Sequence, residues 1–505
     1  MAGGRTSATE LITKVLDAGS WQAWDLPTPS CWATSPAVDP AYRASLAQAR
    51  ARTGLDEAVV AGQGRLAGRA VAVVATEFGF LGGSIGVVAA EWLVLAVERA
   101  TEQGLALLAS PTSGGTRMQE GTVAFLQMAK ITAAVARHRQ AGLPLLVYLR
   151  NPTTGGVLAS WGSLGHVTVA EPGALLGFLG PRVYEALYGE PFPQGVQVAE
   201  NLFRHGLLDA VVRPDALRDV AVRALDVLAA AGDPGPGVDD LPLDPLPDTP
   251  TWESVTRSRR PDRPGVRTLL RQGARDVTPL HGTGVGEDSP GLLLALARFG
   301  CAACVLLGQD RRAQANEGPL GPAALRVARR GMRLAAELHL PLVTVVDTAG
   351  AALSPAAEEG GLAAEIARSL ADLLQLESPT IALLLGQGAG GGALALVPTD
   401  RVLAAQHAWL SPLPPEGAAA ILYRAVERAP EVAEAQRIRS RDLAADGIVD
   451  RIVVERPDAA DEPVAFVRRV ARALEYEITM LATMDPGRRL AARRDRYRRL
   501  GLAER

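Results

Sequence analysis

The two halves of this chain repeat one another, and this repeat constrains the fold more than any other feature of the sequence. Three glycine landmarks recur in the same order, and the residue numbers within each pair differ by nearly the same amount. The pairs are Gly115 and Gly350, Gly156 and Gly392, and Gly206 and Gly447. Self-similarity at a fixed offset is typical of a duplicated structural unit. We therefore expect two domains of the same fold, one after the other.

In each half, a proline-led apolar run ends in glycines that begin a segment of small residues, over 142–157 and then 377–393. A glycine turn between a buried strand and a helix lets a ligand approach the backbone and presents N–H groups at the positive helix end. This is the arrangement of an oxyanion hole, which stabilises charge on a carbonyl oxygen. Tight packing explains a single Gly-Gly as well. Its occurrence at matched places favours two holes, which suit two carbonyl-bearing substrates.

Strand-length and helix-length patterns alternate in both halves and predict an α/β fold. We place the first domain over residues 65–230 and the second over 267–505, ending in a helical tail. Residues 1–64 are interpreted as an N-terminal helical arm. Residues 231–266 are dense in Pro, Asp and Gly, a composition typical of a linker.

The composition excludes several functions. The chain has 505 residues and a formal net charge of −3, which argues against a basic nucleic-acid surface. Three cysteines cannot form a disulfide framework, and no apolar signal core follows Met1–Arg5, so we expect a cytoplasmic protein. Lys14 and Lys130 are the only lysines. Neither lies in a P-loop, nor between the two methionines that mark a biotin attachment site.

One uncharged stretch, from Ser378 to Thr399, is long enough to cross a bilayer. It contains five glycines, however, with Gln387 among them. Glycines at this density favour a buried strand, a glycine turn and the start of a buried helix over a membrane span. We therefore expect no contact with a membrane.

Three short motifs are weak signals in this sequence. Residues 386–391 satisfy G-x-G-x-x-G, but a dinucleotide fingerprint belongs to an early strand–helix–strand unit. Residues 82–86 satisfy G-x-S-x-G without marked Asp and His partners. Cys301 and Cys304 form a lone C-x-x-C inside an apolar strand, and with only Cys31 left over they are better interpreted as buried cysteines than as zinc ligands.

Residues 77–212 resemble the β subunit of the bacterial acetyl-CoA carboxylase carboxyltransferase. The matching strings are F-L-G-G-S-I-G (80–86), S-G-G-T-R-M-Q-E-G (113–121), Q-M-A-K (127–130), P-T-T-G-G-V (152–157) and A-E-P-G-A-L-L-G-F-L-G-P-R-V (170–183). Residues 316–455 resemble the α subunit of the same enzyme. Here the strings are P-L-V-T-V-V-D-T-A-G-A (341–351), A-E-E-G-G (357–361), G-Q-G-A-G-G-G-A-L-A-L (386–396), S-P-L-P-P-E-G-A-A-A-I-L (411–422) and D-L-A-A-D-G-I-V-D (442–450). The order, β then α, is that of fused-chain carboxyltransferases.

The resemblance implies two crotonase-like domains that move a carboxyl group from carboxybiotin to the α-carbon of an acyl-CoA. On the CoA side, Gly155 and Gly156 match the diglycine whose amides face the thioester. Gly114, Gly115 and Arg117 match the loop that flanks the same site. Loss of the α-proton gives a thioester enolate, which the first set of amides would stabilise.

On the biotin side, Gly391, Gly392 and Ala393 match the segment that holds the ureido oxygen, and Gly350 lies in the turn that corresponds to the CoA loop. Release of the carboxyl group leaves a ureido anion, which these amides would stabilise. No side-chain nucleophile is required, and the sequence offers no convincing one.

Three departures from the family pattern stand out. Cys31 is alone where the β subunit usually has a four-cysteine zinc ribbon, so we expect no metal site and no zinc. The α-subunit string D-T-P-G-A-Y-P-G becomes D-T-A-G-A-A-L-S over 347–354, which loses both prolines and the aromatic residue. The family's aspartate after S-x-x-x-L-G is here His166.

The sequence therefore predicts the carboxyltransferase component of a biotin-dependent acyl-CoA carboxylase, which makes malonyl-CoA from acetyl-CoA. No ATP-grasp or biotinyl segment is present, so the resemblance implies a separate biotin carboxylase and biotin carboxyl carrier protein. It also implies a homodimer with active sites between subunits. Two alternatives stay open: a carboxylase or decarboxylase for a longer or branched acyl-CoA, and a non-catalytic acyl-CoA-binding scaffold.

A few charged residues remain. Glu120 is interpreted equally well as a residue that orients the CoA loop and as a surface carboxylate. Glu358 and Glu359 are better explained by the dipole of a helix start than as an acid pair. His166 and His407 are expected to be structural. The eight arginines between 488 and 505 predict a solvated helix or a contact between subunits rather than a phosphate site.

Overall fold

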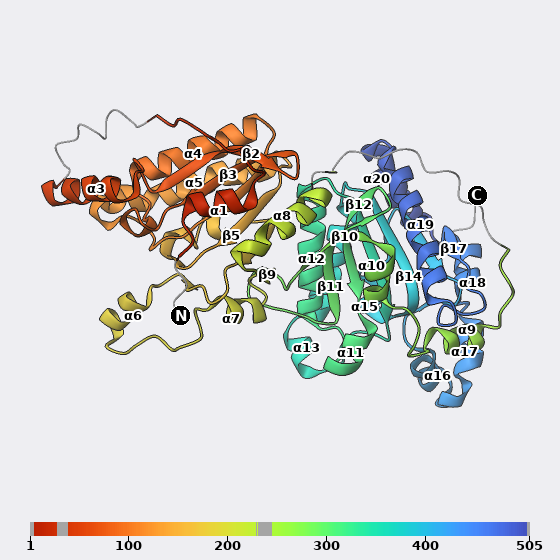
Figure 1. Cartoon of the computed structure of the whole chain (residues 1–505). Coiled ribbons are helices and arrows are strands. Elements are labelled where there is room, and N and C mark those ends of the chain that lie inside the picture. The colour runs from red at the N-terminus through yellow and green to blue at the C-terminus, as the bar shows by residue number, and fades with distance from the viewer. Residues whose placement is uncertain (1–4, 28–38, 229, 231–244, 502–505) are drawn as a thin grey trace. The chain divides into compact units, whose positions relative to one another are not determined.

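A computed structural model describes residues 5–27, 39–228, 230 and 245–501 of the chain, and these form two compact units (Figure 1). The first unit comprises residues 1–229 together with 284–286. The second comprises residues 230–283 and 287–505. Each unit has its own central sheet, and strands and helices alternate in both, as the sequence predicts.

The first unit contains a seven-stranded sheet in the order β1-β2-β3-β4-β5-β7-β9. Its strands are β1 (Gln22–Ala23), β2 (Val59–Leu66), β3 (Arg69–Thr76), β4 (Ala106–Ser110), β5 (Leu145–Leu149), β7 (Val167–Ala170) and β9 (Ala210–Val211), with β6 (Thr153–Thr154) and β8 (Leu176–Gly177) paired separately. Its helices are α1 (Ala8–Val15), α3 (Pro40–Thr53), α4 (Val87–Glu102), α5 (Gly121–Gln140), α6 (Pro181–Tyr188), α7 (Ala199–Arg204) and α8 (Pro214–Leu228). The first three strands are antiparallel, and the rest of the sheet is parallel.

The second unit contains the same path of strands, β10-β11-β12-β13-β14-β15-β17, with β16 paired to β14. Its strands are β10 (Arg275–Leu280), β11 (Leu292–Phe299), β12 (Ala302–Gln309), β13 (Leu342–Thr348), β14 (Thr380–Ala389), β15 (Arg401–Ala405), β16 (Trp409–Ser411) and β17 (Arg451–Val453). Its helices are α9 (Thr251–Ser258), α10 (Val266–Gly273), α11 (Arg311–Glu317), α12 (Pro322–Glu337), α13 (Pro355–Glu359), α14 (Leu362–Gln375), α15 (Gly390–Leu394), α16 (Pro415–Tyr423), α17 (Ala429–Ala435), α18 (Ser440–Ala445), α19 (Pro463–Ala482) and α20 (Pro486–Arg499). The order of antiparallel and parallel pairings also repeats that of the first unit.

Local details of the backbone recur in the two units at a fixed difference in residue number. This difference is the one between Gly350 and Gly115, and we call it the repeat offset. Helices α4 and α12 each have 16 residues and follow an extended glycine, Gly86 in one unit and Gly321 in the other. Beside them, an isolated parallel bridge joins Ile85 to Thr116 in the first unit and Leu320 to Ala351 in the second. The prediction of a duplicated fold is therefore confirmed.

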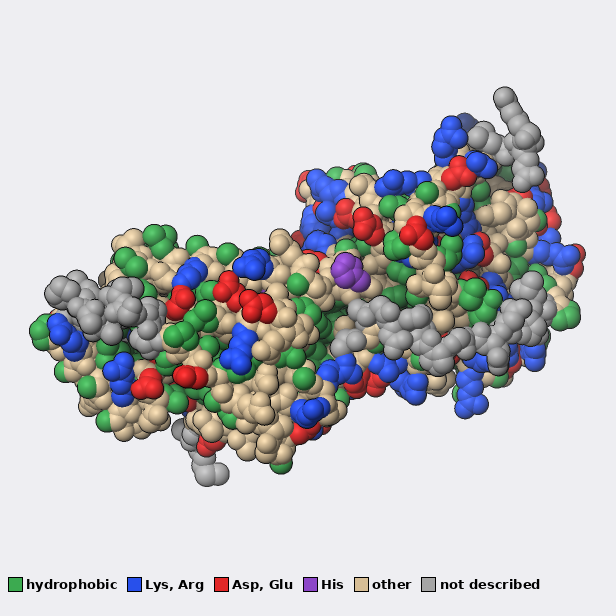
Figure 2. All heavy atoms as spheres, turned by 90° about the horizontal axis from the view of Figure 1, so that it is seen from above, with side chains coloured by type: hydrophobic (Ala, Val, Ile, Leu, Met, Phe, Trp, Pro, Cys, Tyr) green, Lys and Arg blue, Asp and Glu red, His purple; other side chains and the backbone are tan. Residues whose placement is uncertain are grey.

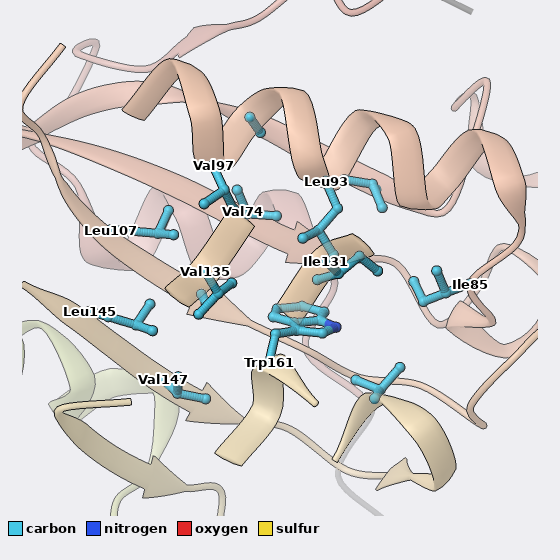
Figure 3. Packing of buried hydrophobic residues seen from close by; sticks show 14 of the residues in the cluster. Val74, Ile85, Leu93, Val97, Leu107, Ile131, Val135, Leu145, Val147 and Trp161 are labelled. Carbon is cyan, nitrogen blue, oxygen red and sulfur yellow. The ribbon is translucent and has the colours of Figure 1, made fainter. Parts of the chain in front are cut away.

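The parallel strands are buried on both faces, which explains their continuous apolar sequences. In the first unit, α4 and α5 pack against each other over the sheet, and their apolar faces join one core. Figure 3 shows Trp161 in this core next to Ile131 and Val135. Because Trp161 lies just after the first glycine turn, the turn is anchored directly to the core.

The structure differs from the predicted domain boundaries in two places. Strand β2 crosses the predicted boundary at residue 64 and pairs with β3, so the N-terminal segment belongs to the first sheet instead of forming a separate helical arm. Residues 251–258, inside the predicted linker, form α9 and pack against the second unit. Residues 231–244 of that linker, and Cys31, lie outside the described residues.

The apolar stretch from Ser378 to Thr399 folds as predicted, with β14 followed by the glycine turn and α15. Across the described part of the chain, no helix is both long enough and apolar enough to span a bilayer. On the face drawn in Figure 2, basic and acidic side chains are interspersed, and they do not gather into one basic field. This distribution agrees with the small net charge.

Candidate active site

The first glycine turn follows β5 and β6, and each of its two glycines is required for a different reason. Gly155 has φ +64°, in the region that favours glycine, and its N–H donates to the carbonyl oxygen of Phe178 at 3.0 Å. At Gly156, an added Cβ would lie 3.0 Å from Met128 Cγ and 3.2 Å from Thr116 Oγ1. Because N–H groups at the start of a helical turn lack an acceptor within it, the turn presents the amide of Gly156, while that of Gly155 is already bonded.

The predicted CoA loop lies directly against this turn. Gly115 has φ +110° and donates its N–H to Ser113 Oγ at 3.0 Å, and the N–H of Gly114 donates to the carbonyl oxygen of Gly82 at 2.9 Å. A Cβ added to Gly155 would come within 3.2 Å of Gly115 Cα, so the two backbones are nearly in contact. The structure thus brings the predicted glycines of the first half together at one place.

Arg117 lies behind this loop, not at its surface. Its guanidinium is 1% exposed and forms a bidentate pair with Glu57 at 2.6 and 2.8 Å. It also donates to the Ser84 carbonyl oxygen at 2.8 Å and to the Tyr42 hydroxyl at 3.2 Å. Burial alone would lower the pKa of Arg117, but the hydrogen bonds and charge of Glu57 outweigh this and raise it. With its donors occupied, Arg117 positions the loop and does not extend toward a ligand.

Glu120 belongs to the same buried cluster. Its carboxylate accepts hydrogen bonds from the Val87 N–H at 2.6 Å and from the Tyr42 hydroxyl, and it lies 3.4 Å from Arg117. An added Cβ at Gly86 would collide with this carboxylate at 2.3 Å. Glu120 therefore caps the N-terminus of α4 and ties it to the CoA loop, which decides against the surface interpretation.

The second glycine turn joins β14 to α15, and its first glycine has the same left-handed conformation as Gly155 of the first turn. Gly390 has φ +64°. A Cβ at Gly391 would lie 2.6 Å from Ile366 Cδ1, whereas one at Gly392 would meet its nearest atom, the Ala351 nitrogen, at 3.6 Å. The last distance is an ordinary contact, so Gly391 needs to be glycine more than Gly392 does.

This geometry corrects the sequence-based pairing of the two turns. Gly155 and Gly390 share a φ of +64°, and they are separated in sequence by the repeat offset, as Gly115 and Gly350 are. On this register, Gly156 corresponds to Gly391 and not to Gly392. Sequence comparison alone was one residue out because three consecutive glycines occupy the second turn and only two occupy the first.

Ala393 was also predicted as an amide donor at the second turn. In an α-helix that begins at Gly390, the N–H of Ala393 is the first that can pair with a carbonyl four residues back, that of Ala389. The N–H groups of Gly391 and Gly392 precede it and lack an acceptor inside the helix. Gly391 and Gly392 are therefore the stronger of the three predicted donors, and a donor role for Ala393 stays a prediction.

The segment that departs from the family pattern still forms the expected turn. Gly350 has φ +137°, and its N–H donates to Thr348 Oγ1 at 3.1 Å, just as Gly115 donates to Ser113. Ala351 lies against Gly392, which places this turn beside α15. The turn therefore has the same local hydrogen bonds as the Ser113–Gly115 turn of the first unit, although it lacks the two prolines and the aromatic residue of the family string.

Two buried polar side chains, Gln309 and Asp347, support the second turn. Gln309, at the end of β12, donates from Nε2 to the Gly392 carbonyl oxygen at 2.7 Å and accepts the Asp347 N–H at 3.0 Å. Asp347 in turn accepts the Gln387 N–H at 3.0 Å, and burial raises the pKa of this carboxyl. The family-like string around Asp347 was a signal in the sequence, but nothing there marked Gln309.

The remaining candidates have structural roles. His166 Nδ1 lies 3.0 Å from the Leu145 nitrogen, and His407 is buried with Nδ1 3.2 Å from Ser254 Oγ. Cys304 is buried, and among the described residues no group of three or more His, Cys, Asp or Glu side chains is placed to hold a metal. The absence of zinc remains a prediction.

The arginine-rich tail is only partly a solvated helix. Arg493 of α20 is buried and pairs with Asp400 at 2.7 and 2.8 Å, and Arg489 is buried beside it. These arginines therefore fix the helix to the second unit. Glu358 and Glu359 lie in α13, whose N-terminus is capped by Ser354, in keeping with a helix-start role.

Exposed apolar side chains occur in both units, and they too form pairs separated by the repeat offset. The pairs are Met118 and Leu353, Phe178 and Leu413, Leu187 and Leu422, and Tyr188 and Tyr423. The last two pairs lie on α6 and α16, and each helix ends in a left-handed residue, Gly189 or Arg424. Large exposed apolar patches typically mark contact surfaces.

Comparisons with known proteins bear on the family of this chain. The model of the family described as carboxyl transferase domain matches residues 34–489. A probable biotin-dependent acyl-coenzyme A carboxylase beta3 subunit of Mycobacterium tuberculosis (strain ATCC 25618 / H37Rv) is 61% identical over 498 residues, 99% of each chain. The acetyl-coenzyme A carboxylase carboxyl transferase subunits beta/alpha of Salinispora arenicola are 38% identical over 527 residues, 99% of this chain and 92% of theirs.

Among solved structures, transcarboxylase 12S with hydrolysed methylmalonyl-coenzyme A bound aligns with a TM-score of 0.73. The alignment covers 95% of this chain and 90% of that one at 22% identity, so it supports the fold alone. The two units are thus crotonase-like domains of a carboxyltransferase. The chain belongs to the carboxyl transferase domain family, that of the biotin-dependent acyl-CoA carboxylases, and the resemblance stated from its sequence motifs is confirmed.

Proposed function

We propose that this chain transfers a carboxyl group from carboxybiotin, carried by a separate protein, to the α-carbon of acetyl-CoA to give malonyl-CoA. The observation that carries the proposal is the pair of glycine turns, which share one backbone geometry at matched places in the two halves. The preference for acetyl-CoA rests on relatives such as the 38% identical chain, which is named for that substrate. The 61% identical relative is named only for an acyl-CoA.

The first turn is assigned to the thioester. When the α-proton leaves, negative charge moves to the thioester oxygen, and the amide of Gly156 is placed to donate to it. Gly114 and Gly115 provide a backbone wall without side chains beside this position. Arg117, through Glu57 and Ser84, holds that wall in place and does not contact the substrate.

The second turn is assigned to biotin. Residues 390–392 carry no side chains, a cradle that suits the close approach of a flat ureido ring to the backbone. The amides of Gly391 and Gly392 are placed to stabilise the charge that the ureido oxygen acquires when the carboxyl group is released. Together the turns stabilise negative charge on two carbonyl groups, and no nucleophilic side chain is needed.

The alternative of a non-catalytic scaffold depends on the altered segment 347–354. The intact turn at Gly350 weighs against it, because the backbone hydrogen bonds of Thr348 reproduce those of Ser113. The alternative of a longer or branched acyl-CoA is a different substrate for the same site, and the experiment below distinguishes it.

The proposed partners are a biotin carboxylase, a biotin carboxyl carrier protein and a second copy of this chain. The matched apolar faces on α6 and α16 support a homodimer in which a first unit pairs with a second unit of the other copy. The proposal predicts that Leu187→Asp and Leu422→Asp each weaken the same assembly, measured by light scattering. An unchanged mass for both variants would contradict it.

The test of function is a substrate panel with the full chain. Malonyl-CoA, methylmalonyl-CoA and a longer carboxyacyl-CoA are incubated with free biotin, and the decarboxylated CoA products are measured. We expect fastest turnover of malonyl-CoA. Faster turnover of a longer or branched compound would transfer the assignment to that substrate. Binding of acyl-CoA with no transfer to or from any compound would favour the scaffold.

A further inference from the structure

The second glycine turn is held from outside by a buried amide side chain that has no counterpart at the first turn. Gln309 is 1% exposed and lies at the last position of β12. It donates from Nε2 to the Gly392 carbonyl oxygen at 2.7 Å, and its Oε1 accepts the Asp347 N–H at 3.0 Å. One side chain therefore connects α15 to the end of β13.

The bond satisfies a carbonyl that the helix itself leaves open. Helix α15 has five residues and ends at Leu394, and the N–H of Ala395 donates to the Gly391 carbonyl. A helix that short leaves its remaining carbonyls without N–H partners inside it. Gln309 supplies the missing donor at Gly392, and a buried carbonyl without one would be destabilising.

The other end of the same side chain fixes the opposite wall of the site. Asp347 precedes the turn that contains Gly350, and its carboxylate accepts the Gln387 N–H at 3.0 Å just before the glycines. Ala351 of that turn lies 3.6 Å from the Cβ position of Gly392. The distance between α15 and the 348–351 turn is therefore set by the bonds of Gln309 and Asp347.

At the first turn, a side chain from the same short segment donates to the carbonyl groups of the turn. Ser160, within the same segment, donates from Oγ to the Gly156 carbonyl oxygen at 2.5 Å, and the same Oγ lies 3.3 Å from the carbonyl oxygen of Val157, the residue that corresponds to Gly392. The residue at the matching strand end is Thr76, whose hydroxyl exchanges hydrogen bonds with Thr112. The bonds of Thr76 to Thr112 hold the loop without a connection to the glycines.

We infer that Gln309 is a positioning residue for the biotin half of the reaction, which clamps α15 against the 348–351 turn so that the Gly391 and Gly392 amides face one ligand position. This inference rests on the proposed function. It assigns Gln309 no contact with substrate, and it predicts that damage to the clamp acts on carboxyl transfer and leaves the acyl-CoA site of the first unit unchanged.

Gln309→Glu is the sharpest probe, because only the protonated form of the new side chain can make both hydrogen bonds of Gln309. A neutral carboxyl group accepts the Asp347 N–H and donates its proton to the Gly392 carbonyl, whereas a carboxylate has no proton to donate. The neighbouring Asp347 carboxyl is itself acted on by the charges of Arg311, Arg263 and Asp310. Burial disfavours the carboxylate, so the variant should regain activity as pH falls.

Turnover of malonyl-CoA with free biotin is measured for wild type and Gln309→Glu between pH 5.5 and 8.5. We expect kcat of the variant to be about 10- to 100-fold below wild type at high pH, with the ratio narrowing as pH falls and an unchanged affinity for acyl-CoA. Gln314→Glu is the matched control. It introduces the same group beside Asp347 and Thr348 without touching Gly392, and its ratio to wild type should not narrow.

A kcat of Gln309→Glu equal to that of wild type at every pH would overturn the inference. A loss of acyl-CoA affinity as large as the loss of kcat would overturn it as well. A second measurement keeps it separate from the proposed function. Hydrogen exchange of residues 386–396 should be faster in Gln309→Met than in wild type, while exchange of residues 150–160 stays the same. If wild type itself transfers no carboxyl group, the proposed function fails, and this exchange difference still decides whether the clamp exists.

Discussion

The two glycine turns share the left-handed conformation of their first glycine but are supported by different side chains. At the first, Ser160 donates to a carbonyl of its own turn, and the loop beside it is held from behind by Arg117 and Glu57. At the second, Gln309 and Asp347 connect the turn to neighbouring strands. The comparison teaches that the duplicated feature is the backbone conformation, while each unit reaches it with its own polar network.

Both units contain buried arginine–carboxylate pairs, and here the expected effect on stability is largest. Arg117 pairs with Glu57 in the first unit, and Arg263 pairs with Glu455 in the second, and all four side chains are buried. Removing one member of a buried pair leaves a charge without a partner and typically costs about 3–5 kcal/mol of the free energy of unfolding. We expect Arg117→Met and Arg263→Met each to show this loss in denaturant titrations.

The control for that prediction is the double substitution of Glu57→Leu with Arg117→Met, which removes both charges. It should recover most of the lost stability, because an apolar pair of similar size is often no less stable than a buried ion pair. A double variant as unstable as Arg117→Met would show that the guanidinium contacts with Ser84 and Tyr42 matter more than its charge.

The next effect in size concerns turnover. Gly156→Val places a branched side chain where Met128 Cγ lies only 3.0 Å from the Cβ position, and it displaces the one amide that the first turn presents. Loss of an oxyanion donor typically lowers kcat by about 100- to 1,000-fold. Carboxyl transfer should fall by this amount in a folded variant, as judged by circular dichroism. A folded Gly156→Val protein with full activity would remove the first turn from the site.

The third effect is a dependence of the free energy of unfolding on pH, to which a different histidine contributes in each unit. Burial lowers the pKa of His138 in α5 to about 4. Below pH 6.5 the unfolded chain binds a proton that the folded protein does not, so the folded state loses stability as pH falls from 6.5 toward 4. At pH 5 the loss amounts to about 2 kcal/mol. His138→Gln should remove this part of the pH dependence, measured by denaturant titration at pH 7 and pH 5.

His407 provides the comparison in the second unit, because burial lowers its pKa as well. The His138→Gln protein should therefore keep a residual loss at low pH, and that loss belongs to the second unit. Identical pH dependence in wild type and His138→Gln would show that His138 accepts its proton without unfolding.

Much of this could be predicted from the sequence, and the failures have physical causes. Repeated glycines and buried apolar runs indicate strands and turns because only a few backbone conformations suit them, so the duplicated fold and the stretch from Ser378 to Thr399 were predicted correctly. The arginine at position 117 was assigned to a ligand because its motif marks a loop. Only coordinates show that Glu57, 60 residues earlier, occupies its guanidinium.

Gln309 illustrates the other kind of failure. Its position at the end of a buried strand looks like any polar strand terminus, and its partners lie 38 and 83 residues away in sequence. A hydrogen bond between distant segments leaves no local pattern. The register of the second turn failed for a related reason, since consecutive glycines offer several alignments and only the backbone φ values distinguish them.

The smallest expected effect tests that register directly. On the corrected pairing, Gly392 corresponds to Val157, a fully buried valine, so the space at this position already accepts a side chain in the first unit. A Cβ at Gly392 would meet nothing closer than 3.6 Å.

Gly392→Ala should therefore fold with stability unchanged or raised by up to about 1 kcal/mol, because alanine favours a helix over glycine. Carboxyl transfer should stay within about 3-fold of wild type, since the backbone amide remains and one tolerated methyl group shifts it little. Gly391→Ala, whose Cβ would lie 2.6 Å from Ile366 Cδ1, requires that side chain to shift and should be the less active of the two variants. The opposite order of the two alanine variants would restore the pairing of Gly156 with Gly392.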